Sequence, residues 1–296
     1  MSAPDVFARG DAQILDRGYR KYDGPRTGVS GAVKAVGRHS MQRALGLRRP
    51  IWWKVLPFAA IAFAYVPAIV FVGIIALFPK NQTADILLPT YGDYYGFVIS
   101  AIMLFVAVAA PEVMCTDRRT GMLGVYLAAP LDRNTYLLAK AASIGAVLSL
   151  VCLGPPLLML IANVLQSTGP TGIGDIADTT WRVLLAGVAI TMLFTGVSVG
   201  VASLTDRKFI AMASIILLFL VSLGFAGSIH DVGGPSGIAA IAPTLLALEM
   251  AQRIHGEYSP IMYGVPSITV WAAWAAWTFG GFGVAWLRLH RLPVTR

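Results

Sequence analysis

The chain has 296 residues, of which 56% are apolar and only 13% are charged. Its apolar residues gather in continuous blocks of about twenty, the length that a helix needs to cross a hydrocarbon core of roughly 30 Å. This pattern predicts an all-α, polytopic membrane protein and excludes a membrane β-barrel, whose strands would alternate over about ten residues. The net charge of +8 follows from the membrane topology argued below, so it indicates no nucleic-acid partner.

Residues 1–50 form a polar and basic extension without the apolar segment of a cleavable signal peptide, so we expect the first span to insert uncleaved. Residues 1 to about 28 are rich in turn formers and charge, which predicts irregular structure unless a partner orders them. Between residues 29 and 49, small and apolar residues recur at helical spacing with basic residues on another face. This pattern favours an interfacial helix in the headgroup region over a soluble helix packed on the loops.

Six spans are predicted within one membrane domain over residues 51–296, each with ends uncertain by a few residues. The predicted spans are residues 53–78, 94–111, 137–165, 182–204, 209–229 and 267–287.

Lysine and arginine predict the orientation of these spans, because basic loops resist translocation. With a cytoplasmic amino terminus, 20 of the 23 basic residues fall inside, and only Lys80, Arg182 and Arg253 fall outside. The imbalance predicts six spans with both termini in the cytoplasm.

The centres of the predicted spans contain no Asp, Glu or His, which argues against a proton-driven carrier and against an intramembrane hydrolase. The two cysteines, Cys115 and Cys152, lie at different depths, so we expect no disulfide, and no metal-ligand spacing is present. The glycine-rich run at residues 31–40 has five residues between its glycines instead of the four of a phosphate loop. We therefore expect no enzyme activity, no metal and no cofactor in this chain, and driving energy must come from a partner.

A charged stretch from Glu112 to Arg133 separates the second and third spans. Within it, Met122, Leu123, Tyr126 and Leu127 form an apolar face at helical spacing, which Pro130 ends. This spacing predicts a short amphipathic helix across the mouth of the bundle. The plain alternative is an ordinary positively charged cytoplasmic loop.

The order of residues in this stretch is an acidic residue, then Gly121, Leu123, Tyr126-Leu127, Pro130-Leu131, Arg133 and finally Lys140. It resembles the coupling region of ABC type-2 transport permeases, the six-span membrane subunits of bacterial ATP-driven exporters. Met122 stands where that family has Thr, and Ala139 stands where it has Gly. The run at residues 19–26 also resembles an amino-terminal signature of some of these permeases.

The resemblance implies a permease subunit of the bacterial plasma membrane, paired with a second copy or a related permease to form the substrate pathway. Separate cytoplasmic ABC ATPase subunits would bind ATP and Mg²⁺ and dock beneath residues 112–133. The residues expected at this contact are Glu112, Asp117, Arg118, Arg119 and Arg133 as polar contacts, and Met122, Leu123, Tyr126 and Leu127 as anchors in a groove. A non-transport membrane scaffold or assembly factor that binds a partner through the same loop is the alternative.

Two further sets of residues are candidates for structural roles. Gly196 and Gly200 have the small-xxx-small spacing that permits close helix approach, either within one chain or between chains. The long external segment before the last span predicts an amphipathic helix, in which Glu249 and Arg253 can pair at i, i+4. In the family such a segment caps the pathway, so the external gate candidates are Leu245, Leu248, Glu249 and Arg253.

Overall fold

The computed structural model describes residue 24 and residues 28–47, 50–77, 89–128 and 130–292, so Lys80 and the run at residues 19–26, apart from residue 24, lie outside the described residues. Within these ranges the regular structure is entirely helical, without strands. Six helical segments are long and apolar enough to cross a membrane, which confirms the all-α class and the six predicted spans. These segments are Lys54–Leu77, Tyr94–Arg119, Arg133–Leu165, Ile173–Ser203, Lys208–Asp231 and Ser267–Arg291.

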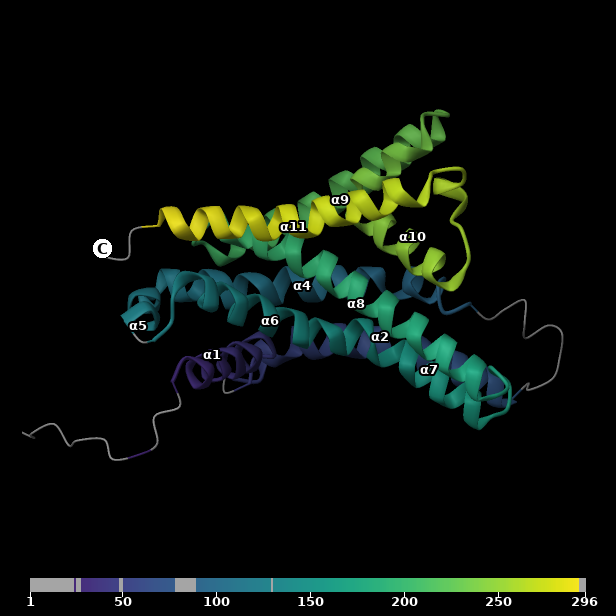
Figure 1. Cartoon of the computed structure of the whole chain (residues 1–296), viewed down its shortest axis with the longest axis horizontal. Helices are drawn as coiled ribbons and strands as arrows, with labels where there is room; N and C mark the ends of the chain where they lie inside the picture. The colour runs from purple at the N-terminus through teal and green to yellow at the C-terminus, as the bar shows by residue number, and fades with distance from the viewer. Residues whose placement is uncertain (1–23, 25–27, 48–49, 78–88, 129, 293–296) are drawn as a thin grey trace, which may run out of the picture.

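Two helices form the centre of the bundle (Figure 1). In the most apolar 18-residue stretch of each helix, 72% of α4 (Tyr94–Arg119) and 78% of α8 (Ile173–Ser203) is buried. The corresponding share is 22% in α2 (Trp52–Leu77), 22% in α9 (Lys208–Asp231) and 17% in α11 (Ser267–Arg291). The outer helices therefore present most of their apolar surface to lipid or to another protein.

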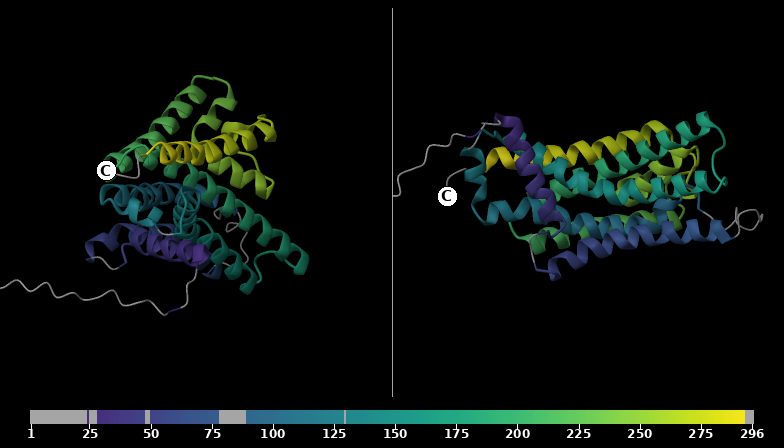
Figure 2. Two further views of the ribbon diagram at one scale, coloured as in Figure 1. Left: turned by 60° about the vertical axis from the view of Figure 1, so that its left-hand side comes forward. Right: turned by 90° about the horizontal axis from the view of Figure 1, so that it is seen from below.

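The two ends of the bundle carry different short elements (Figures 1 and 2). One end, called the α5 end below, holds α1 (Gly28–Ala44), α5 (Met122–Ala128) and the carboxyl end of α11. The opposite end, called the α10 end, holds the elements between α9 and α11. These elements are η1 (Ser236–Ile241), α10 (Pro243–His255) and η2 (Pro260–Met262).

Helix α1 packs across α6 (Arg133–Cys152) and α4. Its buried face includes Val36, Gly37 and Ser40, and the Ser143 hydroxyl donates to the Gly37 carbonyl oxygen at 3.1 Å. The helix includes residues 31–40, so the glycine-rich run is helical and not a phosphate loop. We still predict that the exposed, basic face of α1 lies in the headgroup region of the membrane.

Two helices extend well beyond the spans predicted for them. Helix α4 continues through Pro111 to Arg119, whereas the second predicted span covers residues 94–111. Proline is tolerated in membrane helices when neighbours satisfy the freed backbone, and the charges after it are paired inside the protein, as described below. Helix α8 begins at Ile173, more than two turns before the predicted span at residues 182–204, and its first turns extend past the apolar block at the α10 end.

The third span is broken into α6 and α7 (Gly154–Leu165) at Leu153, a feature that the apolar pattern did not reveal. Pro156 has no N–H to donate to the Cys152 carbonyl, which would be its helical partner. The Tyr95 hydroxyl donates to that carbonyl instead, at 2.9 Å. Tyr65 of α2 donates in the same way to Leu150, at 3.1 Å. Two tyrosines from neighbouring spans thus satisfy the backbone at the break.

Helices α8 and α11 cross at a contact between backbones. A Cβ atom placed on Gly196 would lie 2.4 Å from the Thr278 carbonyl oxygen, and one on Gly200 would lie 2.8 Å from that of Gly281. A Cβ on Gly281 would approach the Gly196 oxygen to 2.2 Å. The small-residue spacing of α8 therefore serves packing within the chain, where dispersion contacts and not hydrophobic exclusion hold helices together.

This contact predicts opposite effects at two adjacent glycines of α11. Gly281→Ala must push α11 away from α8, and we expect it to lower the free energy of unfolding by about 1–3 kcal/mol. Gly280→Ala is the matched control, because a Cβ there meets nothing within 4 Å, and alanine favours the helix. Thermal unfolding in detergent measures both, and an equal effect of the two substitutions would contradict the close crossing.

Candidate coupling site

The predicted amphipathic helix is present as α5, which follows α4 directly. Gly121 makes the turn between them with φ of +70°, a conformation that favours glycine. Beyond Pro130, Asp132 begins α6 with a capping box, accepting from the Thr135 N–H at 2.9 Å. The Thr135 hydroxyl and N–H together lower the pKa of Asp132, which keeps the cap ionised.

Within α5, the predicted apolar face divides into an inner and an outer side. Leu123 is buried, Tyr126 and Leu127 are half-buried against the core, and Met122 is 40% exposed. Val125, which the sequence pattern did not single out, is 62% exposed. The residues that α5 presents outward are therefore Met122 and Val125.

A buried carboxylate lies beneath α5. Asp117, in the last turn of α4, is fully buried and contacts both Arg43 of α1 and Lys140 of α6 at 2.5 Å. The Tyr136 hydroxyl donates to its second oxygen at 3.1 Å. Because an isolated carboxylate is costly in a low-dielectric interior, these donors are what permit Asp117 to lie there.

A second carboxylate continues this arrangement toward α9. Glu112, one to two turns earlier in α4, forms an ion pair with Lys208 at the start of α9. Arg43 bridges the two carboxylates, with its second nitrogen 3.9 Å from a Glu112 carboxylate oxygen. We call these residues the ion-pair cluster; its members are Arg43, Glu112, Asp117, Lys140 and Lys208. The cluster joins α1, α4, α6 and α9.

Helix α5 contacts the cluster through an aromatic residue. The ring of Tyr126 lies 5.9 Å from that of Tyr136, and the Lys140 ammonium lies 5.5 Å from each ring centre. Burial raises the pKa of Tyr126, and the charge of Asp117 adds to the shift, so its hydroxyl remains protonated. A displacement of α5 would therefore disturb the cation that Asp117 binds.

Two arginines expected to contact a partner bind the ends of helices in the same chain. Arg118 donates to the Ala202 and Ser203 carbonyl oxygens at the end of α8, both at 2.7 Å. Arg133 donates to three carbonyls at the end of α11, including that of Leu292 at 3.1 Å. Cations stabilise helix carboxyl ends, where carbonyls lack intrahelical partners. Arg119 is the exposed member of the predicted polar set.

Two hollows open at the α5 end beside these residues. One of about 410 Å³ lies between α1, the end of α4 and α5, and its walls include His39, Gln42, Met122 and Tyr126. The other, of about 340 Å³, is lined by charged groups, including Arg119 and Asp206. The first places an apolar residue of α5 beside polar residues of α1, which suits a partner that touches both helices.

At the α10 end, the predicted pair of Glu249 and Arg253 is formed and buried. Arg253 also donates to the Val265 carbonyl at 2.8 Å, and Glu249 accepts from the Ser259 N–H at 3.1 Å. The pair thus holds the segment between α10 and α11. Leu245 and Leu248 are half-buried beside it, so the gate role of these four residues stays a prediction.

The structure brings together residues that sequence reasoning kept apart. In the sequence, Arg43 and Lys208 have the pattern of positive loop charges, and Tyr136 that of an ordinary span residue. Periodicity could not reveal their contacts with Asp117 and Glu112, since Arg43 and Asp117 are 74 residues apart. One signal was present: Lys140, a lone cation in an apolar span, needed a buried partner.

No protein-family model matches the chain, and no curated protein matches it. Among the described residues, no cluster of three His, Cys, Asp or Glu side chains has the arrangement of a metal site.

The cluster predicts unequal effects at its members. Asp117→Leu leaves Arg43 and Lys140 buried without their carboxylate, so we expect a loss of about 3–5 kcal/mol in unfolding free energy. Lys140→Met leaves Asp117 paired with Arg43 and should cost less. Asp178→Leu, at a solvent-exposed pair with Arg182, is the control and should cost about 0–1 kcal/mol. Denaturant unfolding in detergent checks the order; an Asp117→Leu effect no larger than the control would contradict it.

Proposed function

We propose that this chain is the membrane-spanning permease subunit of an ATP-driven exporter of the ABC type-2 kind. A separate cytoplasmic ATPase would bind and hydrolyse ATP with Mg²⁺, and α5 would receive its motion. The resemblance of residues 112–140 to the family's coupling region motivates the proposal. The observation that carries it is the position of α5, which exposes apolar side chains while resting on the ion-pair cluster.

The exposed side of α5 has the chemistry of a docking element. Met122 and Val125 project from a seven-residue helix beside the hollow that α1 shares. Exposed apolar groups next to polar ones are typical of helices that insert into a groove of a partner. In this proposal, the buried carboxylates of Glu112 and Asp117 support α5 from beneath and do not contact the partner themselves.

The cluster supplies a route by which a push on α5 reaches the spans. Tyr126 couples α5 to Tyr136 and Lys140, and Asp117 then joins α6 to α4 and α1. Glu112 extends the connection to α9 through Lys208. Buried ion pairs tolerate little misalignment, because each charge left without its partner is costly. Motion of α5 would therefore move these helices together.

The outer faces of α2, α9 and α11 leave room for a second permease chain. Most of each helix is unburied, so a copy of this chain or a related one could cover part of that surface and complete a pathway. The alternative, a scaffold that binds a cytoplasmic protein through α5, uses the same docking side. The two differ in whether the partner hydrolyses ATP.

We further propose that the α5 end faces the cytoplasm of a bacterial cell and that the chain lies in the plasma membrane with both termini inside. The excess of basic residues in the corresponding loops supports this orientation. It places α10 and the Glu249–Arg253 pair outside, over the outer ends of the spans.

The orientation is testable by labelling from outside the cell. Arg291→Cys, at the end of α11, should react with an impermeant thiol reagent only after permeabilisation. Tyr263→Cys, 76% exposed at the α10 end, should react in intact cells. Both native cysteines are buried and give a low background. Labelling of Arg291→Cys in intact cells would exclude the proposed topology.

The docking role of α5 is testable by changing Val125. Val125→Asp should reduce recovery of the co-purifying ATPase at least about tenfold, because loss of a buried interface anchor costs roughly 1–4 kcal/mol. Val232→Asp is the matched control, since Val232 is 82% exposed at the opposite end of the bundle. Both variants should insert and fold normally. Equal recovery of the ATPase with both variants would remove α5 from the interface.

The same preparation separates the exporter from the scaffold. The purified chain alone should show no ATP hydrolysis above background, whereas the complex should hydrolyse ATP and lose this activity on Val125→Asp. A partner that is not an ATPase would favour the scaffold, and saturable hydrolysis by the isolated chain would contradict the division of labour.

A further inference from the structure

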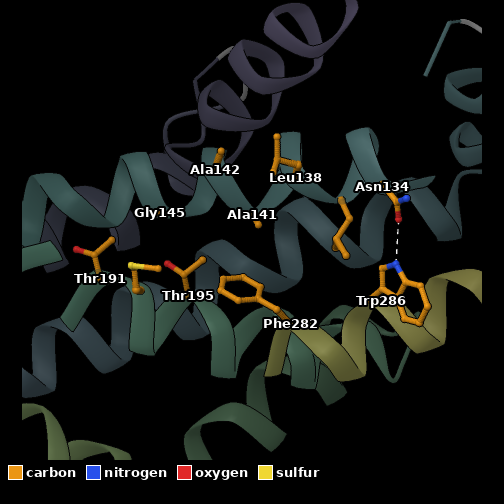
Figure 3. A pocket seen from close by; sticks show the side chains of 11 residues that line it. Asn134, Leu138, Ala141, Ala142, Gly145, Thr191, Thr195, Phe282 and Trp286 are labelled. Atoms are coloured by element: carbon orange, nitrogen blue, oxygen red, sulfur yellow. Dashed lines mark hydrogen bonds between the residues drawn. The ribbon is translucent and has the colours of Figure 1, made fainter. Parts of the chain in front are cut away.

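A cavity of about 410 Å³ lies between α6, α8 and α11 (Figure 3). Helix α6 lines it with Ala141, Ala142 and Gly145. Alanine has only a methyl group and glycine has no Cβ, so these residues leave space at the helix surface. Phe282 and Trp286, one turn apart on α11, form the opposite wall. The volume falls in the range of sites for small molecules, about 300–1,000 Å³.

One end of the cavity is closed by a hydrogen bond. The Trp286 indole N–H donates to the Asn134 side-chain oxygen at 2.9 Å, where α6 begins (Figure 3). This bond satisfies the polar atom of the indole and fixes the ring as a wall.

The cavity opens toward the membrane. Leu138 and Trp286, at its rim, are 66% and 45% exposed, and both belong to helices that are candidate spans. In the part of the chain that the structure describes, no charged side chain lines the cavity. A molecule that enters must therefore dissolve in the hydrocarbon of the bilayer and carry no net charge at the part that is bound.

The cavity also contains a hydroxyl that requires a partner. Thr195 of α8 is 3% exposed, and its oxygen has no hydrogen-bond partner among the described residues. A Cβ atom on Gly145, across the cavity wall, would lie 3.6 Å from that oxygen, so the hydroxyl faces the space beside α6. In a medium without water, such a group is costly unless a ligand bonds to it.

From these observations we propose that the cavity binds a neutral membrane lipid, whose hydrocarbon chain fills the space between Phe282 and Ala141. A carbonyl or hydroxyl group on the lipid would bond to the Thr195 hydroxyl. A second protein chain fits the observations less well, because a helix satisfies its backbone hydrogen bonds internally and would leave the Thr195 hydroxyl without a partner. The lipid would be held whether or not α5 docks an ATPase, so this site is independent of the proposed transport function.

The site is tested with the full chain in lipid nanodiscs and a diacylglycerol that carries a photoreactive acyl chain. Irradiation should label peptides of α6 and α11 that contain Leu138 or Trp286. Gly145→Leu fills the cavity, since a Cβ fits there at ordinary contact distance, and should reduce labelling at least tenfold. Ala146→Leu, the next residue and exposed outside the cavity, is the matched control and should keep labelling unchanged.

Thr195→Val tests the hydroxyl itself, since valine keeps the shape of threonine. We expect it to weaken diacylglycerol binding roughly threefold to tenfold, the effect of one buried hydrogen bond, while the unfolding temperature stays equal or rises. A lower unfolding temperature with unchanged lipid binding would show that the hydroxyl serves packing alone and would overturn its assigned role. Should Gly145→Leu fail to fold, Ala141→Leu fills the same space.

Three results would overturn the lipid site. The first is equal labelling of the Gly145→Leu and Ala146→Leu proteins. The second is equal competition by phosphatidylglycerol and by diacylglycerol, because a site for the neutral lipid should prefer the uncharged competitor. The third is efficient cross-linking between two copies through Leu138→Cys at the rim, which would show that protein and not lipid covers the opening.

Discussion

The carboxylate of Asp117 is the group on which the α5 end of this protein depends. It lies inside the bundle without solvent, where an ionised acid is retained only with close cations and donors. Arg43 and Lys140 each lie at 2.5 Å, which ties the amino-terminal helix and the third span to α4 at one point. Pairing inside the protein is also what allows α4 to continue as a helix past Pro111, and this continuation sets where α5 begins.

The sequence predicted the elements that depend on local chemistry. Blocks of apolar residues predicted the spans, because every helix in lipid must satisfy its own backbone. Pro130 predicted the end of α5, since proline disfavours the continuation of a helix. The spacing of Glu249 and Arg253 predicted their pair, which is one helical turn long.

The elements that depend on distant residues could not be predicted in this way. A charge outside an apolar block is expected to face water, but Glu112 and Asp117 are buried because α1 and α9 supply cations from far along the chain. The division of the third span likewise depends on Tyr65 and Tyr95, which lie in other spans. Two adjacent prolines marked the place, although nothing nearby in the sequence showed that a break would be tolerated.

That break divides the third span into pieces with different mechanical attachments. The first piece, α6, is anchored to the ion-pair cluster and to α1, whereas α7 packs against α2. A continuous helix would act as a rigid rod and transmit any tilt of its lower half across the whole bilayer. Beside Leu153, the carbonyl oxygens of Leu150 and Cys152 accept hydrogen bonds from tyrosines. The span can therefore bend at this point while these carbonyls keep their hydrogen bonds. The two pieces of this span, α6 and α7, can therefore follow different neighbours during the same movement.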